Sequence, residues 1–166
     1  MNSLIDGLLF SWGKNSDYAE QLVSDLSDEQ MTAQPAPEGK APANHPAWVL
    51  SHLNVYLPIV EKMLDGESFE DPKGHQFGME SKPEADATIY APKAELISSF
   101  VTGHQRVAEK LRQADPSVLE NEIVLERWKP VFPKVGNALP YLMLLHENGH
   151  LGQISAWRRI QGMPSV

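Results

Sequence analysis

The chain has 166 residues, of which 42% are hydrophobic and 22% charged, and it contains no cysteine. This composition is typical of a folded globular protein, and the length predicts a single domain over residues 1–166. The absence of cysteine excludes disulfides, thiolate–metal sites and a cysteine nucleophile, so a metal must be held by His, Asp or Glu. The net charge of −8 argues against a nucleic-acid partner, because phosphate backbones are bound by basic surfaces.

The N-terminal segment does not have the pattern of a targeting sequence. It lacks a basic leader, and Asp6 and Lys14 interrupt its apolar residues, which argues against a signal peptide. Elsewhere no apolar run reaches the roughly 20 residues that a membrane span requires. We therefore expect a cytoplasmic protein that has no membrane partner.

Apolar residues at helical spacing predict four amphipathic helices. They cover about residues 3–26, 44–66, 92–113 and 137–162. In the second helix, Asn44 is the expected N-cap residue, and Pro58 predicts a kink in its interior. In the fourth helix, Pro140 is tolerated in the first turn. Four such helices without a convincing sheet predict an all-α four-helix bundle.

The segments between the helices are polar and rich in proline or glycine. Residues 27–43 are expected to form no regular element, and residues 122–128 are a candidate for a short strand. The connectors 67–91 and 114–136 are unusually long for a compact domain. In four-helix proteins such connectors serve as crossovers or as lids, and the sequence leaves both roles open.

The most informative motif is His146-Glu147-Asn148-Gly149-His150. Two histidines four residues apart lie on one face of a helix, one turn from each other. Buried imidazoles need partners for both ring nitrogens, and a metal satisfies one nitrogen of each ring. The two residues are therefore candidate metal ligands, with core histidines as the alternative. They continue an otherwise apolar stripe, formed by Met143, His146, His150, Ile154 and Trp157.

The same motif matches H-E-x-x-H of zinc proteases. That interpretation fails because Gln153 and Ala156 occupy the positions of the further glycine and histidine, and no acidic residue follows Glu147. Glu147 remains a candidate catalytic base, but it is rotated by about 100° from His146, so an outer helix carboxylate is the alternative. Gly149 indicates close approach of another element, or a tolerated defect.

A third ligand must come from another helix. His52, on the apolar stripe of the second helix, is the best candidate, because antiparallel packing brings it to the height of the histidine pair. Three imidazoles leave coordination positions open, as in catalytic zinc sites. Tyr56, His104 and Gln153 are candidate pocket residues, Gln153 through a hydrogen bond to an imidazole. The other two histidines are assigned no role.

These motifs resemble those of the DinB-like superfamily, which includes the YfiT-type proteins. The resemblance rests on Trp48 to Leu53, on H-E-x-x-H-L-G-Q-I at 146–154, and on the closing Arg-Arg and Gly-Met-Pro sequences of 158–164. It implies an up-down-down-up four-helix bundle, commonly a homodimer. It also implies that His52, His146 and His150 bind a divalent metal such as zinc or nickel.

Activities known in that superfamily are transfers that involve low-molecular-weight thiols and a thiol-dependent isomerisation. The resemblance therefore favours a metal-dependent enzyme, a thiol S-transferase or a hydrolase, that acts on a small molecule. The alternatives are a dimeric metal-binding or stress-response bundle without catalysis, and a metal-free bundle. The long connectors are expected to supply apolar pocket residues, namely Phe77, Met79, Tyr90, Trp128 and Phe132.

Overall fold

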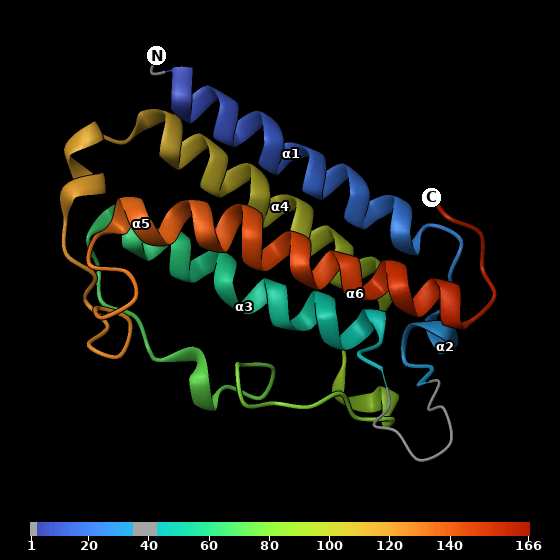
Figure 1. Cartoon of the computed structure of the whole chain (residues 1–166). Helices are drawn as coiled ribbons and strands as arrows, with labels where there is room; N and C mark the ends of the chain where they lie inside the picture. Colours follow the sequence, from blue (N-terminus) through green and yellow to red (C-terminus); the bar gives the residue numbers. More distant parts are fainter. Residues whose placement is uncertain (1–2, 35–42) are drawn as a thin grey trace.

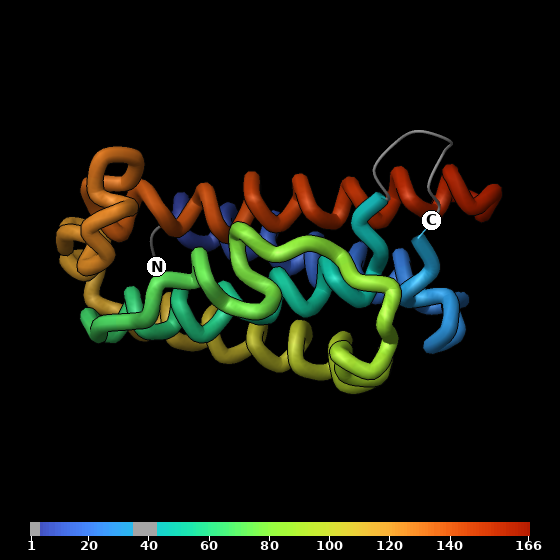
Figure 2. The backbone as a smooth tube through the Cα atoms, turned by 90° about the horizontal axis from the view of Figure 1, so that it is seen from below, coloured from blue at the N-terminus to red at the C-terminus, as the bar shows by residue number. Residues whose placement is uncertain are grey.

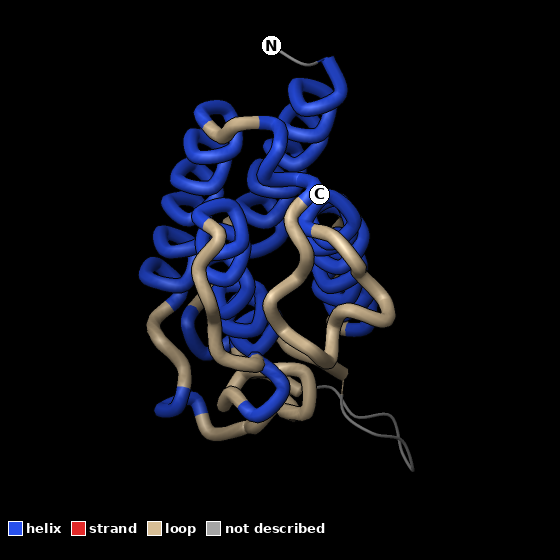
Figure 3. Tube along the Cα trace, turned by 90° about the vertical axis from the view of Figure 1, so that its left-hand side faces the viewer, coloured by secondary structure: helices blue, strands red, loops and turns tan. Residues whose placement is uncertain are grey.

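The predicted amphipathic helices pack side by side in the computed structural model, which describes residues 3–34 and 43–166 (Figure 1). No strand occurs within these ranges, and Figure 3 shows helices and loops only. None of the described helices has the length and apolar character that a membrane span requires. The long elements are α1 (Ser3–Val23), α3 (Pro46–Asp65), α4 (Lys93–Gln113), and the C-terminal α5 (Val135–Pro140) and α6 (Glu147–Ile160).

The helix directions give the up-down-down-up order that the resemblance implies. α1 and α6 run one way and α3 and α4 the other (Figure 1), and α3 lies against both α4 and α6. Because α3 and α4 are parallel neighbours, the chain must return along the whole bundle between them. Residues 67–91, with the short turns η1 (Pro72–Gly74) and η2 (Ala87–Ile89), make this return across α3 (Figure 2). This connector is a crossover.

The passage 27–43 contains a regular element that the prediction missed. α2 (Asp28–Met31) begins at a reciprocal cap, in which Ser27 Oγ accepts from the Gln30 backbone and Gln30 Oε1 accepts from the Ser27 backbone. Two otherwise unpaired backbone donors are thereby satisfied, which allows so short a helix to form. The prediction of no regular element is wrong for this part, and residues 35–42 lie outside the described ranges.

The second predicted helix begins one residue later than expected. His45, not Asn44, is the N-cap residue of α3, and its Nδ1 accepts from the Trp48 backbone N–H at 3.2 Å. Pro46 then occupies the first helical position, where the backbone N–H has no partner within the helix, so proline costs no hydrogen bond. α3 continues through Pro58 to Asp65.

The connector 114–136 folds into turns. After η3 (Pro116–Glu120), Glu122 pairs with Lys134 in an isolated bridge, and no strand forms over residues 122–128. Within this segment, Trp128 N donates to Leu125 O and Phe132 N to Trp128 O. Local turn hydrogen bonds thus replace the strand pairing that residues 122–128 suggested.

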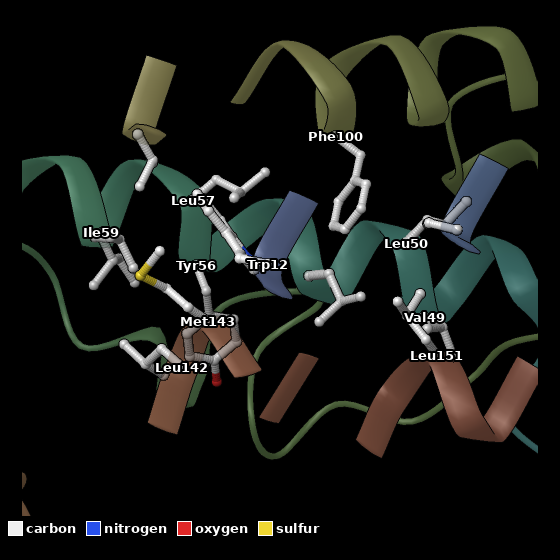
Figure 4. Packing of buried hydrophobic residues seen from close by; sticks show 14 of the residues in the cluster. Trp12, Val49, Leu50, Tyr56, Leu57, Ile59, Phe100, Leu142, Met143 and Leu151 are labelled. Atoms are coloured by element: carbon white, nitrogen blue, oxygen red, sulfur yellow. The ribbon is translucent and has the colours of Figure 1, made fainter. Parts of the chain in front are cut away.

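The buried interior contains large aromatic side chains from α1 and α4 and a charged side chain from α6. Trp12 of α1 and Phe100 of α4 pack over α3 in the core (Figure 4). Arg158 is 2% exposed, and its guanidinium binds both oxygens of Asp25 and the carbonyl of Leu22. The first arginine of the Arg-Arg pair therefore ties the end of α6 to the end of α1.

Two glycines show how closely neighbouring helices approach. A methyl group on Gly103 would lie 2.6 Å from Leu57 Cδ1 and 3.2 Å from its Cβ, so α3 and α4 meet here. At Gly149 a methyl group would meet nothing within 4 Å. Of the two interpretations of Gly149, close approach of another element is wrong, which leaves a tolerated helical glycine; a close approach occurs at Gly103.

These two positions make a matched pair of substitutions. Gly149→Ala should stabilise the protein by up to about 1 kcal/mol, because alanine favours the helix without a clash. Gly103→Ala forces Leu57 to move, and overpacking typically costs about 1–3 kcal/mol. We expect urea denaturation to give Gly149→Ala a free energy of unfolding at least about 1 kcal/mol higher than that of Gly103→Ala. Equal free energies of unfolding would contradict the close packing of Gly103 against Leu57.

Candidate metal centre

Three histidines from two helices converge. His52 lies on the second turn of α3, His146 ends the π-helical turn η4 (Tyr141–His146), and His150 lies on the first turn of α6. One ligand nitrogen from each ring lies within 4.8 Å of the other two. The Nε2 atoms of His52 and His146 are 3.1 Å apart. Antiparallel packing of α3 and α6 thus brings the predicted ligands to one height.

Two of the imidazoles are oriented through their outer nitrogens. His52 Nδ1 lies 2.7 Å from the carbonyl oxygen of Phe77, to which it donates, so Nε2 carries the free lone pair. His150 Nδ1 lies 3.1 Å from Gln153 Oε1, which also accepts from Asn44 Nδ2 at 2.9 Å. Such hydrogen bonds from the far side of the ring are typical of metal-binding histidines, because they fix the tautomer and the ring direction.

His146 supplies the observation that tests the fit of a metal. Its Nδ1 is buried and has no hydrogen-bond partner within the described part of the chain. In the free protein, His146 Nε2–H can donate to His52 Nε2, which leaves that buried Nδ1 as an unsatisfied acceptor. One ligand nitrogen from each of His52, His146 and His150 would hold a metal in place of this proton, so the close Nε2 pair would no longer have to share it. The donor set, three neutral imidazoles, fits a divalent metal that prefers imidazole, such as zinc or nickel.

The environment of the cluster keeps the imidazoles neutral. Burial, together with the nearby His150, lowers the pKa of His52 to about 4. Burial and the two neighbouring histidines lower the pKa of His146 to about 3. Burial also lowers the pKa of His150, which the bond to Gln153 opposes. Neutral imidazole is the form that binds a metal, so protons compete weakly at neutral pH.

The buried stripe of the C-terminal helix differs from the predicted one. Beyond Met143 it continues through Glu147 and Leu151, while His146 and His150 are only half-buried. The cause is the π-helical turn η4, which has more residues per turn than an α-helix. The residue that follows Met143 on the core side is therefore about four to five positions later, at Glu147. The turn follows Pro140, which has no N–H to continue the α-helical ladder. Asn15 of α1 donates to the carbonyl of Met143 within it.

Glu147 consequently faces the core between α1 and α4. It is 4% exposed, and its Oε2 accepts from Trp12 Nε1 at 2.9 Å and lies 3.0 Å from His104 Nε2. The His104 ring stacks on Trp12 with a centroid distance of 3.9 Å. Of the alternatives for Glu147, an exposed position on the outer face of the helix is wrong. The structure does not bring Glu147 or His104 to the three-histidine cluster.

Tyr56 and Gln153 do lie at the cluster. The Tyr56 ring centroid is 5.0 Å from that of His52 and 4.6 Å from that of His146. Gln153 contacts His150 as predicted, and its second partner, Asn44, was not predicted. The remaining histidines are structural: His45 caps α3 and lies 3.0 Å from the carbonyl of Glu84, and His75 accepts from the Phe77 backbone.

A cavity of about 390 Å³ opens beside the three histidines. Of the predicted apolar pocket residues, Met79, Trp128 and Phe132 line it. Phe77 and Tyr90 do not; their rings stack on each other at 5.3 Å, and they line other cavities of the structure. The lining also includes residues that the prediction did not assign to the pocket: Trp48, Arg127, Val131, Tyr141 and Leu142.

Arg127 and Trp48 are the polar contributors that sequence reasoning missed. Trp48 stacks on His52 at a centroid distance of 4.9 Å and donates through Nε1 to Ser81 Oγ. Arg127 binds Asp71 through two nitrogens. Trp48, four residues before His52 on the same helix, could have been found by its helical spacing. No sequence signal links Arg127 to the cluster, because it comes from a connector.

Comparison with known families identifies the superfamily of the chain. A sequence model described as the DinB superfamily matches residues 12–154. The chain belongs to the DinB superfamily. This match contains all three histidines and the L-G-Q-I segment, whereas the Arg-Arg and Gly-Met-Pro sequences lie beyond it. No curated protein matches the chain significantly.

The lowered pKa values predict how acid acts on the metal-free DinB-superfamily bundle. The unfolded histidines have a pKa near 6.5, above the folded values of about 4 and 3, so the unfolded state binds more protons as pH falls below 6.5. Between pH 7 and pH 5 the free energy of unfolding should fall by about 2–4 kcal/mol. Urea titrations at several pH values measure this change.

The matched control replaces both titrating groups. A His52→Gln/His146→Gln variant should lose distinctly less stability over the same pH range. An identical pH profile in the two proteins would show that other groups cause the acid sensitivity.

The buried Glu147 carboxylate predicts a large structural effect. Glu147→Ala leaves the N–H groups of Trp12 and His104 without an acceptor and should lower the free energy of unfolding by about 2–4 kcal/mol. Glu147→Gln, which keeps one acceptor oxygen, should lose less. The exposed neighbour Asn148 is the control, and Asn148→Ala should stay within about 0.5 kcal/mol of wild type. Equal stability of Glu147→Ala and wild type would refute the buried hydrogen bonds.

Proposed function

We propose that this DinB-superfamily protein binds zinc or nickel through His52, His146 and His150 and uses it in a reaction on a small molecule. The reaction is a thiol S-transfer or a hydrolysis, with a low-molecular-weight thiol as the favoured partner. The observation that carries the proposal is the convergence of three imidazole nitrogens within 4.8 Å beside a cavity of about 390 Å³.

Three features of the donor set support a catalytic site. The grouping contains three histidines and no carboxylate among the described residues, so coordination positions stay open for a ligand. The cavity borders all three histidines, which gives a ligand access to those positions. A metal held by neutral imidazoles keeps its full charge and lowers the pKa of a bound thiol or water toward neutrality.

The chain's own residues prepare the cavity for a small molecule. Aromatic and apolar side chains, among them Trp48, Trp128 and Phe132, form most of the wall and limit the access of water. Tyr56 is 8% exposed, and burial raises the pKa of its hydroxyl. The phenol therefore stays protonated at neutral pH, and its O–H is available to donate a hydrogen bond to a substrate atom.

The placement of Glu147 argues against a protease-type mechanism. In that mechanism the glutamate of H-E-x-x-H acts as general base at the metal. Here Oε2 of Glu147 is engaged by Trp12 and His104 in the core. A reaction in which the substrate brings its own acidic group, such as a thiol, requires no base from this position.

Metal content tests the proposal directly. Protein purified without a polyhistidine tag should take up about one equivalent of zinc or nickel. His52→Ala removes one of three ligands and should weaken binding by more than about 100-fold. A competition titration with a chromophoric chelator measures both affinities.

His75→Asn is the control, because His75 lies outside the cluster and asparagine keeps an acceptor for the Phe77 N–H. This variant should bind metal as the wild type does. Uptake of less than about 0.3 equivalents by the wild type would refute the proposal. A metal that only raises the melting temperature, with no thiol or other small molecule altering its spectrum, would favour a non-catalytic site.

A further inference from the structure

The cavity beside the histidines has one formally charged residue in its wall. That residue is Arg127, and none of the acidic residues in the described ranges lines this cavity. The contrast is informative because the chain has 22 acidic residues against 14 basic ones. The two larger cavities of the described structure, of about 760 and 660 Å³, both have acidic side chains in their walls. The described wall of this cavity therefore lacks the acidic side chains that predominate in the protein as a whole.

The guanidinium of Arg127 is held in place from one side. Its Nε donates to Asp71 Oδ2 at 2.7 Å and its Nη2 to Asp71 Oδ1 at 2.5 Å, a two-pronged contact that orients the planar group. The side chains of both residues are about one-third exposed. Asp71 belongs to the crossover, where it caps η1. The ion pair therefore joins the two long connectors at the cavity.

The remaining nitrogen of the guanidinium has only a weak partner. Nη1 lies 3.7 Å from Met79 Sδ, and a thioether is a poor acceptor for a charged donor. Met79 itself is exposed and lines the same cavity. An oxygen anion is a far better acceptor than this sulfur. The side of Arg127 opposite Asp71 is thus available for a ligand that carries negative charge.

We propose that Arg127 selects substrates by binding a carboxylate in the cavity while the three-histidine site binds the reactive group. This inference rests on the proposed function and narrows its substrate class to small molecules with a carboxylate. Most of the other residues that line the cavity are aromatic or aliphatic, among them Trp128, Val131 and Phe132, which follow Arg127 within five positions of the sequence. The rest of the ligand is therefore apolar.

Binding of matched thiols to the zinc-loaded full chain tests the proposal. The probes are mercaptopropionate and mercaptohexanoate, each beside the mercaptoalcohol of the same chain length. Two chain lengths are used because the shorter acid can also chelate the metal. Calorimetry should give an affinity about tenfold or more higher for the better-fitting acid than for its alcohol, as expected for a charged hydrogen-bonded contact.

The variants separate the role of Arg127 from that of the metal. Arg127→Gln should remove the preference for the acid and leave the affinity for the alcohol and the metal content unchanged. Arg127→Lys, which keeps the charge but not the planar fork, should retain part of the preference. Arg106→Gln is the matched control, since Arg106 pairs with Glu61 away from this cavity, and it should behave as wild type.

The outcomes distinguish this inference from the proposed function. An equal preference for the acid in wild type and Arg127→Gln, or none in wild type, would overturn the role of Arg127 even if the metal binds. If the wild type takes up no metal, the proposed function fails. The inference is then decided on the metal-free protein with phenylpropionate beside phenylpropanol. Loss of the acid preference in Arg127→Gln would support it, and no preference in the wild type would refute it.

Discussion

The rotation of the C-terminal helix about its own axis decides which residues face the core and which face the histidine cluster. The π-helical turn η4 sets this rotation, and the hydrogen bonds of one buried carboxylate hold it. Glu147 accepts hydrogen bonds from Trp12 of α1 and is bonded to His104 of α4. A buried carboxylate without such partners would be very unfavourable, so the helix cannot turn away from them. With Glu147 on the core side, His146 faces α3, and its Nε2 lies 3.1 Å from Nε2 of His52.

Helical spacing was enough to predict the four long helices, because a repeat of apolar residues reports directly which face is buried. Helical spacing also predicted that His52, His146 and His150 would come together. It did not predict which face of the last helix is buried, because both His146 and Glu147 lie about one turn from Met143. Only the π-helical turn decides which of the two faces the core. The small helix α2 was predictable in principle, since its cap has the S-x-x-Q pattern.

The connectors could not be placed from the sequence, because their contacts join residues far apart in the chain. The order of the helices nevertheless determines where one of them runs. Parallel neighbours α3 and α4 require a crossover along α3, and this path brings the carbonyl of Phe77 to His52. The same path brings Asp71 to Arg127 of the other connector. The topology that closes the bundle therefore also supplies the hydrogen bonds that orient the site.

The electrostatics of the cavity connect the two proposals. Burial keeps the three imidazoles neutral, so they cannot offset the charge of a divalent metal, and no carboxylate lines the wall to do so. On the two proposals, negative charge would come from the ligand. A thiol that lost its proton would supply it at the metal, and a carboxylate would supply it beside Arg127. A substrate with both groups and an apolar spacer would bind at both places, which a neutral thiol or a simple carboxylic acid cannot do.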